Sequence, residues 1–403
     1  MHWFALFLGI LAVTGTLTST IFLLLTLIGS WRFHRSAAEQ WRAAAALQDD
    51  ELPFVSLLKP MHGVEPQLEQ NFESFFVLDY PRYEVIFACD HADDPAIELA
   101  NRVRARHPEV PSQVVINGEP PWPNRQNYSL YSAAQVAKSD ILVTSDSDVI
   151  VTPDYLRQVV PPMLSKRTGV LTCVYRGLST GGFWSLMDAI GMSVEMTSGV
   201  LVANLMEGMK FALSPTLVLN RQAHESMGGY TATGFYFSHD FVIGNRIAKN
   251  GYDVVLSRHI ISHVVPPMSF GRMWNHLLRW AAGTLRSRPM GHLGTGLIFA
   301  VPYGILAMLA GLMLGHPWIG AALLGWSILN RMIESVVVGW GITRDPVCLR
   351  RPWLYAVRDL IGFAVWVASY IVNDLSWRER SFELMNDGRI RVRENQPTIP
   401  APQ

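Results

Sequence analysis

An uninterrupted apolar run near the N-terminus constrains the fold most strongly. No charged residue occurs from Trp3 to Ser30, and such a run is longer than the roughly 20 residues that a membrane-spanning helix requires. It lacks the small-residue cleavage site of a signal peptide, so it predicts an uncleaved anchor, with a buried core helix as the alternative. Because basic side chains follow the run, the positive-inside rule places Met1 outside and the next domain in the cytoplasm. These basic residues are Arg32, His34, Arg35 and Arg42.

The composition supports a membrane protein. Of the 403 residues, 49% are hydrophobic and 16% are charged, which is too apolar for an ordinary soluble enzyme. The formal net charge is zero, so no basic field points to nucleic acid as a partner. Cys89, Cys173 and Cys348 stand far apart, without metal-ligand spacing or a disulfide framework. We therefore expect the lipid bilayer as a partner and a reduced, cytosolic setting for the polar part. Arginine outnumbers lysine, as in proteins of GC-rich bacterial genomes.

Residues 50–265 show the pattern of an α/β domain. Short apolar segments alternate there with amphipathic ones, which is typical of strands joined by helices. The first four strands and their three crossover helices predict a nucleotide-binding half. The expected strands are 54–58, 83–88, 113–116, 141–143 and 169–175, and the expected helices are 67–78, 95–106, 128–138 and one that ends at Asn250-Gly251.

The remaining segments predict helices at or in a membrane. Residues 268–289 are amphipathic, basic and aromatic, a pattern typical of a helix at a membrane surface. Residues 293–314 and 318–340 are both long enough to span, and 183–204 form an apolar helix or pair of helices against the membrane. Arg331 and Glu334 are three residues apart, so they share a helix face and we expect them to pair.

The last apolar stretch, residues 360–372, is short for a crossing. If it crossed, the arginines of the tail would lie outside, against the positive-inside rule. We favour a re-entrant or interfacial segment with a cytoplasmic tail, and a true crossing is the alternative. The expected order is a transmembrane anchor at 1–31, a cytoplasmic catalytic domain at 50–265, an interfacial helix at 266–290, transmembrane or re-entrant helices at 291–375 and a cytoplasmic tail at 376–403.

Asp146 and Asp148 stand one residue apart directly after an apolar strand. Carboxylates at such a strand end offer rigid oxygen ligands to a hard divalent cation, which usually accompanies a nucleotide diphosphate. In open α/β sheets, ligands bind beyond the carboxyl ends of the strands. Pro153-Asp154 marks the start of the next helix. The segment therefore predicts a sugar-nucleotide site, and a solvated loop is the alternative because Asp and Ser are common in turns.

Three further sites complete the set that transfer from a nucleotide sugar requires. Asp93-Asp94 supplies a carboxylate near the nucleotide, Asp240 a general base for an acceptor hydroxyl, and Arg279-Trp280 a cation for the departing phosphate. Each has a structural alternative: the aspartates could cap helices, and Arg279-Trp280 could be an interfacial pair.

These motifs belong to an ordered set that covers most of the chain, and in that set the sequence resembles the ceramide glucosyltransferase family. This family lies within the inverting, family-2-type glycosyltransferases of GT-A fold. The resemblance implies an α/β GT-A domain with transmembrane or interfacial helices. Its main stretches are Val55-Ser56-Leu57-Leu58-Lys59-Pro60, Asp90-His91-Ala92-Asp93-Asp94-Pro95, Ser145-Asp146-Ser147-Asp148, Gly228-Gly229, His239-Asp240-Phe241, Leu278-Arg279-Trp280 and the tail from Ser376 to Gly388.

The resemblance implies a role for each site. Asp94 and Asp146 would contact the nucleotide sugar, Asp240 would be the general base, and Arg279 with Trp280 would hold the diphosphate. Asp146, with Asp148 as a second ligand or a supporting acceptor, would bind Mg²⁺ or Mn²⁺. Three positions depart from the family pattern: His276 replaces Gln or Arg, Gln126 replaces Lys with Arg125 adjacent as a possible nucleotide contact, and His239 replaces an acid.

These features predict an inverting enzyme in a bacterial inner membrane that moves glucose from UDP-glucose to the primary hydroxyl of ceramide. The nearest alternative is transfer of glucose or N-acetylglucosamine from a UDP-sugar to a hopanoid or another lipid alcohol. A processive polysaccharide synthase would need more spanning helices than this chain offers. A non-catalytic membrane binding module is the alternative from another class.

Overall fold

The computed structural model describes residues 2–371, 374–377 and 380–392. The chain divides into two compact units. The helical unit comprises Met1–His34, Tyr175–Gly208 and Val265–Asn373, and the α/β unit comprises Arg35–Val174, Met209–Val264 and Asp374–Gln403. The boundaries predicted from the sequence stay a prediction.

The α/β unit is built on an eight-stranded sheet with the order β3-β2-β1-β4-β7-β6-β8-β5. The first four strands in this order are parallel, and β7 is antiparallel to both of its neighbours. The sheet is therefore mixed, and the predicted α/β class is confirmed. Its strands are β1 (Val55–Pro60), β2 (Tyr83–Cys89), β3 (Ser112–Ile116), β4 (Ile141–Ser145), β5 (Val149–Ile150), β6 (Thr168–Ser179), β7 (Thr216–Asn220) and β8 (Asp253–Val265).

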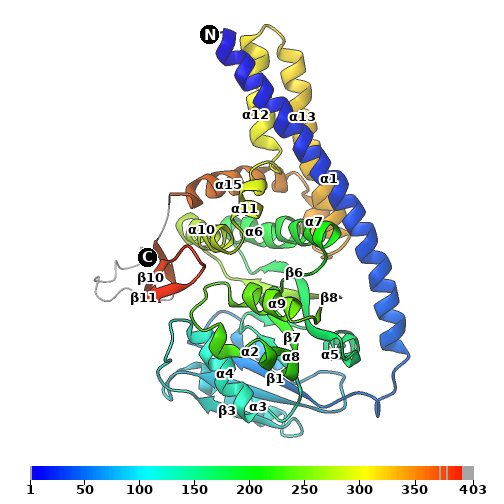
Figure 1. Cartoon of the computed structure of the whole chain (residues 1–403), viewed down its shortest axis with the longest axis vertical. Coiled ribbons are helices and arrows are strands. Elements are labelled where there is room, and N and C mark those ends of the chain that lie inside the picture. Colours follow the sequence, from blue (N-terminus) through cyan, green and yellow to red (C-terminus); the bar gives the residue numbers. More distant parts are fainter. Residues whose placement is uncertain (1, 372–373, 378–379, 393–403) are drawn as a thin grey trace. The chain divides into compact units, whose positions relative to one another are not determined.

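The parallel half agrees with the prediction because three of its four strands are buried on both faces. β1, β2 and β4 are buried along their whole length, which is why they read as continuous apolar runs. Leu57 lies in register with Val85 on one side and Val143 on the other. The helices of this unit (Figure 1) are α2 (Leu68–Glu73), α3 (Ala96–Arg106), α4 (Arg125–Val136), α5 (Tyr155–Val159), α8 (Arg221–Ser226) and α9 (His239–Lys249), with short 3-10 turns η1 (Pro161–Leu164) and η3 (Tyr230–Ala232).

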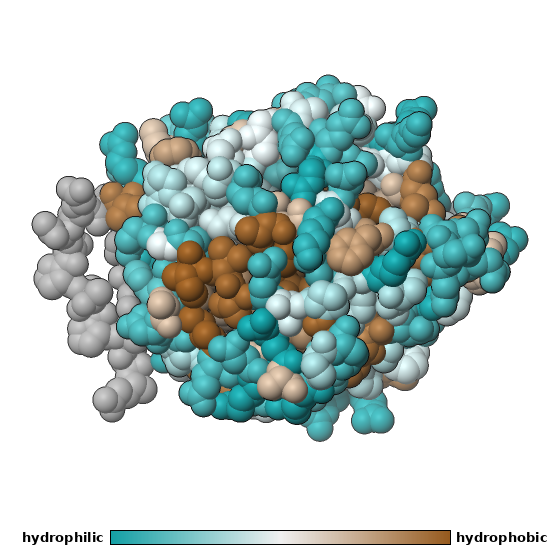
Figure 2. Space-filling view, turned by 90° about the horizontal axis from the view of Figure 1, so that it is seen from below, coloured by the Kyte–Doolittle hydropathy of each residue, from teal (hydrophilic) through white to brown (hydrophobic). Residues whose placement is uncertain are grey.

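The sheet ends on one side at β3, which is the least buried strand of the parallel half. Its residues are half-buried, and Ile116 is exposed. Figure 2 looks at the molecule from below and shows an apolar patch within a mostly hydrophilic surface.

A separate three-stranded sheet comprises β9 (Asp374–Trp377), β10 (Arg380–Leu384) and β11 (Ile390–Val392).

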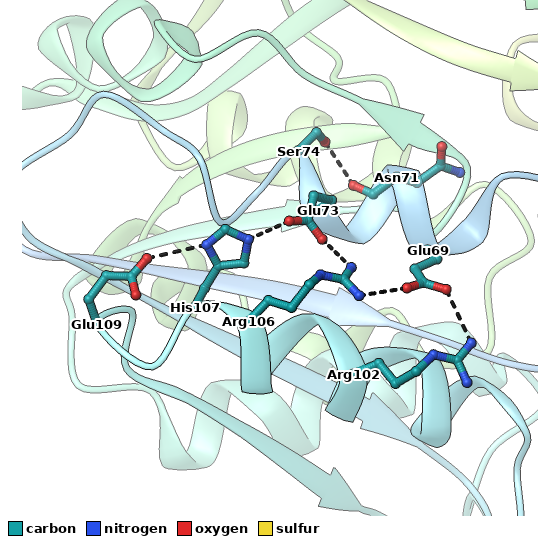
Figure 3. A network of polar contacts seen from close by, with 8 residues as sticks. All are labelled: Glu69, Asn71, Glu73, Ser74, Arg102, Arg106, His107 and Glu109. Atoms are coloured by element: carbon teal, nitrogen blue, oxygen red, sulfur yellow. Dashed lines mark hydrogen bonds and ion pairs between the residues drawn. The ribbon is translucent and has the colours of Figure 1, made fainter.

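The helix predicted at 67–78 is shorter than expected, since α2 ends at Glu73. A network of charged side chains joins α2 to α3 (Figure 3). Glu69 accepts from Arg102 at 3.1 Å and from Arg106 at 2.8 Å, and Glu73 pairs with Arg106 and His107. Single exposed ion pairs contribute little, whereas a shared network fixes geometry. The short helix is therefore attached to its neighbour along one side.

Among the described residues, three helices of the helical unit and its borders are long and apolar enough to cross a membrane. They are α1 (His2–Ala45), the continuous helix of α6 (Phe183–Ile190), η2 (Gly191–Met196) and α7 (Thr197–Glu207), and the continuous helix of α13 (Pro317–Glu334) and η4 (Ser335–Trp340). The predicted spans at the N-terminus and at 318–340 are confirmed as candidates.

The stretch at 293–314, predicted to be long enough to span, is not one continuous helix. The chain forms α11 (Pro289–Thr295) and then α12 (Val301–Met313), which has 13 residues. Gly296 lies between them, and a Cβ there would come within 2.3 Å of the Trp366 ring. Glycine disfavours helix, and Pro302 stands at a helix start, so the segment breaks there.

The region that follows contains α14 (Pro346–Arg350) and α15 (Leu354–Ser369). Of the stretch predicted at 360–372, residues 360–369 lie in α15, Tyr370 and Ile371 form the turn after it, and Val372 lies outside the described residues. α15 has 16 residues, fewer than the roughly 20 that a spanning helix requires, and its re-entrant or interfacial character stays a prediction. The predicted tail, 376–403, is described at 376–377 and 380–392 only.

The predicted pairing of Arg331 with Glu334 is confirmed. Their side chains are buried and 2.9 Å apart, and Arg331 also lies 3.5 Å from Asp359. The Asp359 carboxylate accepts hydrogen bonds from the Ala300 and Val301 backbone N–H groups at the start of α12. Buried charges persist only when they are paired and hydrogen-bonded, so this cluster joins three helices of the unit.

Candidate functional site

The segment from Asp146 to Asp148 joins β4 to β5, and a hydrogen bond holds each of its three carbonyl groups. Lys59 Nζ donates to Asp146 O at 2.6 Å, Asn71 Nδ2 donates to Ser147 O at 2.9 Å, and Val264 N donates to Asp148 O at 2.8 Å. Asn71 lies on α2, the helix that the charged network attaches to α3. The backbone of the segment is therefore fixed from three sides.

Lys59 is a site residue to which the sequence assigned no role. It lies one residue before the end of the strand β1 and is fully buried, and its Nζ lies 3.8 Å from the centre of the Phe75 ring. Burial lowers the pKa of Lys59 to about 7, although attraction to Asp146 and Asp148 opposes the shift. A lysine within an otherwise apolar strand was the available signal, because buried lysines are rare unless they have a partner.

The two carboxylates of the segment have different surroundings. Asp146 Oδ1 accepts a hydrogen bond from Gln126 Nε2 at 2.5 Å, so the residue that stands where the family usually has Lys contacts Asp146 directly. Asp148 Oδ2 is 3.3 Å from His263 Nε2. Asp148 Oδ1 is buried and has no hydrogen-bond partner among the described residues, so it is an acceptor available to a ligand.

Asp240 begins α9, and the residues before β7 link it to Asp146. Asp240 Oδ2 accepts a hydrogen bond from Ser214 N at 2.7 Å, and its Oδ1 accepts one from Phe241 N at 2.8 Å. The Asp146 N–H group donates to Pro215 O at 3.0 Å. Because Ser214 and Pro215 are consecutive, the fold brings two predicted site residues together from positions 94 residues apart in the chain.

His239, which stands where the family has an acid, is buried beside Asp240. Asn124 Nδ2 lies 3.2 Å from His239 Nδ1 and also donates to Tyr236 O at 3.0 Å. Burial lowers the pKa of His239, against the attraction of Asp240. A neutral imidazole that accepts the Asn124 amide agrees with this direction.

Asp94 and Arg125 are held by protein groups of their own. Asp94 accepts hydrogen bonds from Ala96 N at 2.8 Å and from Gly63 N at 3.0 Å, so it holds the first N–H group of α3, whose N-cap position is Pro95. Arg125 lies 3.3 Å from Asp90 and 3.2 Å from Glu119. No contact in the described chain joins either residue to Asp146, and their predicted roles toward the nucleotide stay predictions.

Arg279 and Trp280 lie on α10 (Phe270–Ser287) of the helical unit. Met273, Leu277 and Leu278 are buried along the same helix, which confirms that it is amphipathic. His276 Nδ1 is 2.8 Å from the buried carboxylate of Asp188, and its ring lies 4.6 Å from that of Trp280. The carboxylate therefore orients the histidine that opens the Arg-Trp motif.

The carboxylates of the α/β unit do not form a complete metal cage. No group of three His, Cys, Asp or Glu side chains that could hold an ion occurs among the residues described. Mg²⁺ usually takes one or two protein carboxylates together with substrate phosphates and water. Asp146 and Asp148, with the available Oδ1 of Asp148, fit that kind of site.

Comparison with known proteins identifies the family of the chain. A model of the family described as glycosyl transferase family 21 matches residues 11–390. The chain belongs to glycosyl transferase family 21. The predicted enzyme class is confirmed, and so is the resemblance on which that prediction was based.

Curated relatives of this family member include two proteins of Caenorhabditis elegans. Ceramide glucosyltransferase 1 is 24% identical over 87% of this chain and 76% of its own length. Ceramide glucosyltransferase 3 is 23% identical over 85% of this chain and 75% of its own length.

Solved structures with similar folds include other glycosyltransferases. The mannosyltransferase PcManGT from Pyrobaculum calidifontis, in complex with GDP-Man and Mn²⁺, is 18% identical over 89% of this chain and 99% of that chain, with a TM-score of 0.48. TarS 1-349 of S. aureus in complex with UDP-GlcNAc is 14% identical over 86% and 98%, with a TM-score of 0.39.

Proposed function

We propose that the protein is an inverting glycosyltransferase that moves glucose from UDP-glucose to the primary hydroxyl of ceramide. The observation that carries this proposal is the link between Asp146 and Asp240 through Ser214 and Pro215. This link connects Asp146, the acid expected at the sugar donor UDP-glucose, with Asp240, the acid expected at the acceptor hydroxyl of ceramide. The names of the curated relatives support ceramide as the acceptor.

Asp240 is the proposed general base. Two backbone N–H groups hold its carboxylate, and an ionised carboxylate still has lone pairs for a further donor. The carboxylate accepts the proton of the ceramide hydroxyl while that oxygen attacks the anomeric carbon from the face opposite the departing UDP. A single displacement of this kind inverts the configuration at the anomeric carbon.

The α10 side chains are the proposed contacts of the diphosphate. Arg279 supplies a guanidinium group, which suits phosphate oxygens because its N–H groups match them in pairs. Trp280 flanks it, and His276, oriented by Asp188, replaces the amide or guanidinium that the family usually has there. Arg125 and Asp94 are the proposed contacts of the nucleotide on the α/β unit.

A divalent cation, Mg²⁺ or Mn²⁺, is the proposed cofactor, held by Asp146 with Asp148. Asp148 Oδ1 supports this assignment, because a buried carboxylate oxygen without a hydrogen-bond partner in the described chain is costly unless a ligand takes it up. When bound, such a cation offsets the negative charge of the diphosphate.

The proposed acceptor and location follow from the apolar helices. A lipid alcohol partitions into the bilayer that the three candidate spans would enter. We place the protein in the inner membrane of a bacterium, with the α/β unit on the cytoplasmic side where UDP-sugars occur. The basic residues that follow the first span agree with this orientation.

Labelled donors test the proposal. Purified protein is incubated with labelled UDP-glucose or UDP-N-acetylglucosamine and a membrane lipid extract that contains ceramide and hopanoids, and the glycolipids are identified by mass spectrometry. We expect labelled glucosylceramide from UDP-glucose. A labelled hopanoid glycoside would favour the nearest alternative, a polymer would favour a processive synthase, and binding without product would favour a non-catalytic module.

A further inference from the structure

A cavity of about 740 Å³ lies in the α/β unit beside the proposed catalytic residues and contains none of them. Its walls come from the loop before α4, the segment before α9, α9 itself and the hairpin of β10 and β11. The side chains that matter to its chemistry are Trp122, Phe235, Tyr236, Arg246, Arg389 and Arg391.

The β10–β11 hairpin forms one wall of the cavity and pairs with the segment before Asp240. Ile390 N donates to Phe235 O at 2.8 Å, Phe237 N donates to Gly388 O at 3.1 Å, and Tyr236 forms a bridge with Arg389. The cavity is therefore framed by backbone hydrogen bonds rather than by loosely packed loops.

Two guanidinium groups gather at the Tyr236 ring. Arg246 Cζ lies 5.4 Å from the ring centre and Arg389 Cζ lies 5.7 Å from it. Arg246 also donates to Ala232 O at 3.1 Å and to the Tyr236 hydroxyl at 3.3 Å. Arg391 is exposed on the same hairpin. Positive charges held this close together repel one another unless an anion lies between them.

The lining offers no carboxylate to balance these three cations. Outside the lining, Asp387 lies 3.4 Å from Arg389, and Glu383 stands opposite Arg391 in the hairpin register. No ion pair with Arg246 or Arg391 occurs in the described part of the chain. An arginine has five N–H donors and no acceptor, so an anion would supply acceptors that no carboxylate of the lining provides.

The apolar wall adds a further donor. The Trp122 Nε1 group is buried and has no hydrogen-bond partner among the described residues. Trp122 packs edge-on against Tyr128 and Tyr131, with ring centres 5.2 and 5.7 Å apart, so its position is fixed. A buried donor without a partner costs free energy that an acceptor-only ligand would recover.

We propose that this cavity is a binding site for an anionic, phosphate-bearing ligand. Arg246, Arg389 and Arg391 hold the phosphate oxygens, and the body of the ligand lies against Phe235 and the Trp122 ring. The phosphate belongs either to an anionic lipid headgroup or to a free phosphate ester, since both present the same acceptor-only chemistry. The site is separate from the proposed UDP-sugar site.

Isothermal titration calorimetry on the full chain in neutral detergent tests this proposal. One arm uses dihexanoyl phosphatidate and the other uses glycerol phosphate. We expect saturable binding in at least one arm, and we expect the double variant Arg246→Gln with Arg391→Gln to weaken it by about tenfold or more, because each charge-assisted hydrogen bond lost reduces affinity. Binding of phosphatidate alone identifies the lipid as the source, and equal binding of glycerol phosphate identifies a free ester.

Three variants serve as controls. Arg167→Gln removes an exposed arginine of the same unit that pairs with Asp253 and should bind as the wild type does. Arg391→Lys keeps the charge and should retain most of the affinity. Thermal unfolding of the double variant checks that it is folded. The proposal is overturned if neither probe binds, if the folded double variant binds as tightly as the wild type, or if UDP competes with the probe.

Discussion

At the scale of single residues, the acids of the α/β unit differ in the hydrogen bonds that they already accept. Asp94 accepts hydrogen bonds from the backbone N–H groups of Gly63 and Ala96, and the second of these begins α3. Asp148 keeps a buried oxygen without a partner in the described chain. Asp240 accepts two backbone N–H groups and is fixed in place. These differences agree with the ligand role proposed for Asp148 and with the base role proposed for Asp240.

The first prediction concerns Asp240→Asn. The amide has nearly the same shape but cannot take a proton from the acceptor, so we expect kcat to fall by at least about 100-fold. The affinity for UDP-glucose should change little. Transfer rates and donor binding by calorimetry measure the two effects. Asp253→Asn, at an exposed carboxylate, is the matched control. Loss of donor binding instead would refute the base assignment.

The second prediction concerns Lys59→Met. The substitution keeps much of the side-chain volume but removes the 2.6 Å hydrogen bond to Asp146 O, which then keeps only the 3.4 Å bond from Val149 N, and a hydrogen bond from a charged group contributes about 1.5–3 kcal/mol. We expect the segment from Asp146 to Asp148 to loosen and the KM for UDP-glucose to rise about tenfold. Steady-state kinetics measure this change. Lys138→Met, at an exposed position, should keep the wild-type KM, and an unchanged KM in Lys59→Met would argue against a positioning role.

The third prediction concerns pH and His224. Burial, with Arg221 nearby, lowers the pKa of His224 to about 4. The folded state therefore keeps the imidazole neutral, while the unfolded chain takes up a proton below its usual pKa near 6.5. The contribution of His224 to the free energy of unfolding is therefore fully present above pH 6.5. It is lost as the pH falls toward 4, by up to about 3 kcal/mol.

His224→Phe tests the assignment, because the ring stays apolar beside Tyr230, whose ring centre is 4.2 Å away. Unfolding free energies of both proteins are measured between pH 4 and 7 in the same detergent. As the pH falls, the free energy of unfolding should decrease less in the variant than in the wild type, because the variant lacks the imidazole that the unfolded chain protonates. Parallel curves would show that His224 does not titrate in this range.

At the scale of elements, apolar patterns predicted strands better than they predicted helix ends. β1, β2 and β4 were predictable because each is an apolar run buried on both faces. α2 ended at Glu73, earlier than predicted. Its Glu69 and Glu73 pair with Arg106 of α3, which is distant in sequence. The helix in the segment at 293–314 is interrupted at Gly296, where a Cβ would collide with the Trp366 ring. Such contacts are tertiary, and a hydropathy pattern does not contain them.

The fourth prediction concerns the β10–β11 hairpin. Gly388 adopts a φ of 82°, which disfavours other residues, and its carbonyl accepts from Phe237 three residues before Asp240. Gly388→Val should strain the turn, weaken this pairing and lower kcat. Hydrogen exchange of the Phe237 amide should become faster.

Gly251→Val is the matched control, because Gly251 has a similar φ of 88° and open space around its Cα. This variant should lose stability without faster exchange at Phe237. Equal exchange rates at Phe237 in the wild type and Gly388→Val would contradict a positioning role for the hairpin.

At the scale of the whole molecule, the sequence predicted the α/β class and the enzyme family better than it predicted how the proposed site residues meet. The strand before Asp146 and the ordered motifs indicated the α/β class and the enzyme family. The meeting of Asp146 with Asp240 depends on β7, an antiparallel strand that the pattern did not indicate, and on Ser214 and Pro215 before it. Lys59 and Asn71 were missed for the same reason, because their partners are backbone carbonyls distant in sequence.

Acceptor competition in one membrane tests the central claim most directly. The wild type is reconstituted into vesicles with equal amounts of ceramide and a hopanoid alcohol, and labelled UDP-glucose is added with Mg²⁺. Mass spectrometry and NMR of the product identify the lipid and the anomer. We predict labelled glucosylceramide with inverted, β configuration. A labelled hopanoid glycoside, a retained α linkage or labelled free glucose alone would contradict the proposed function.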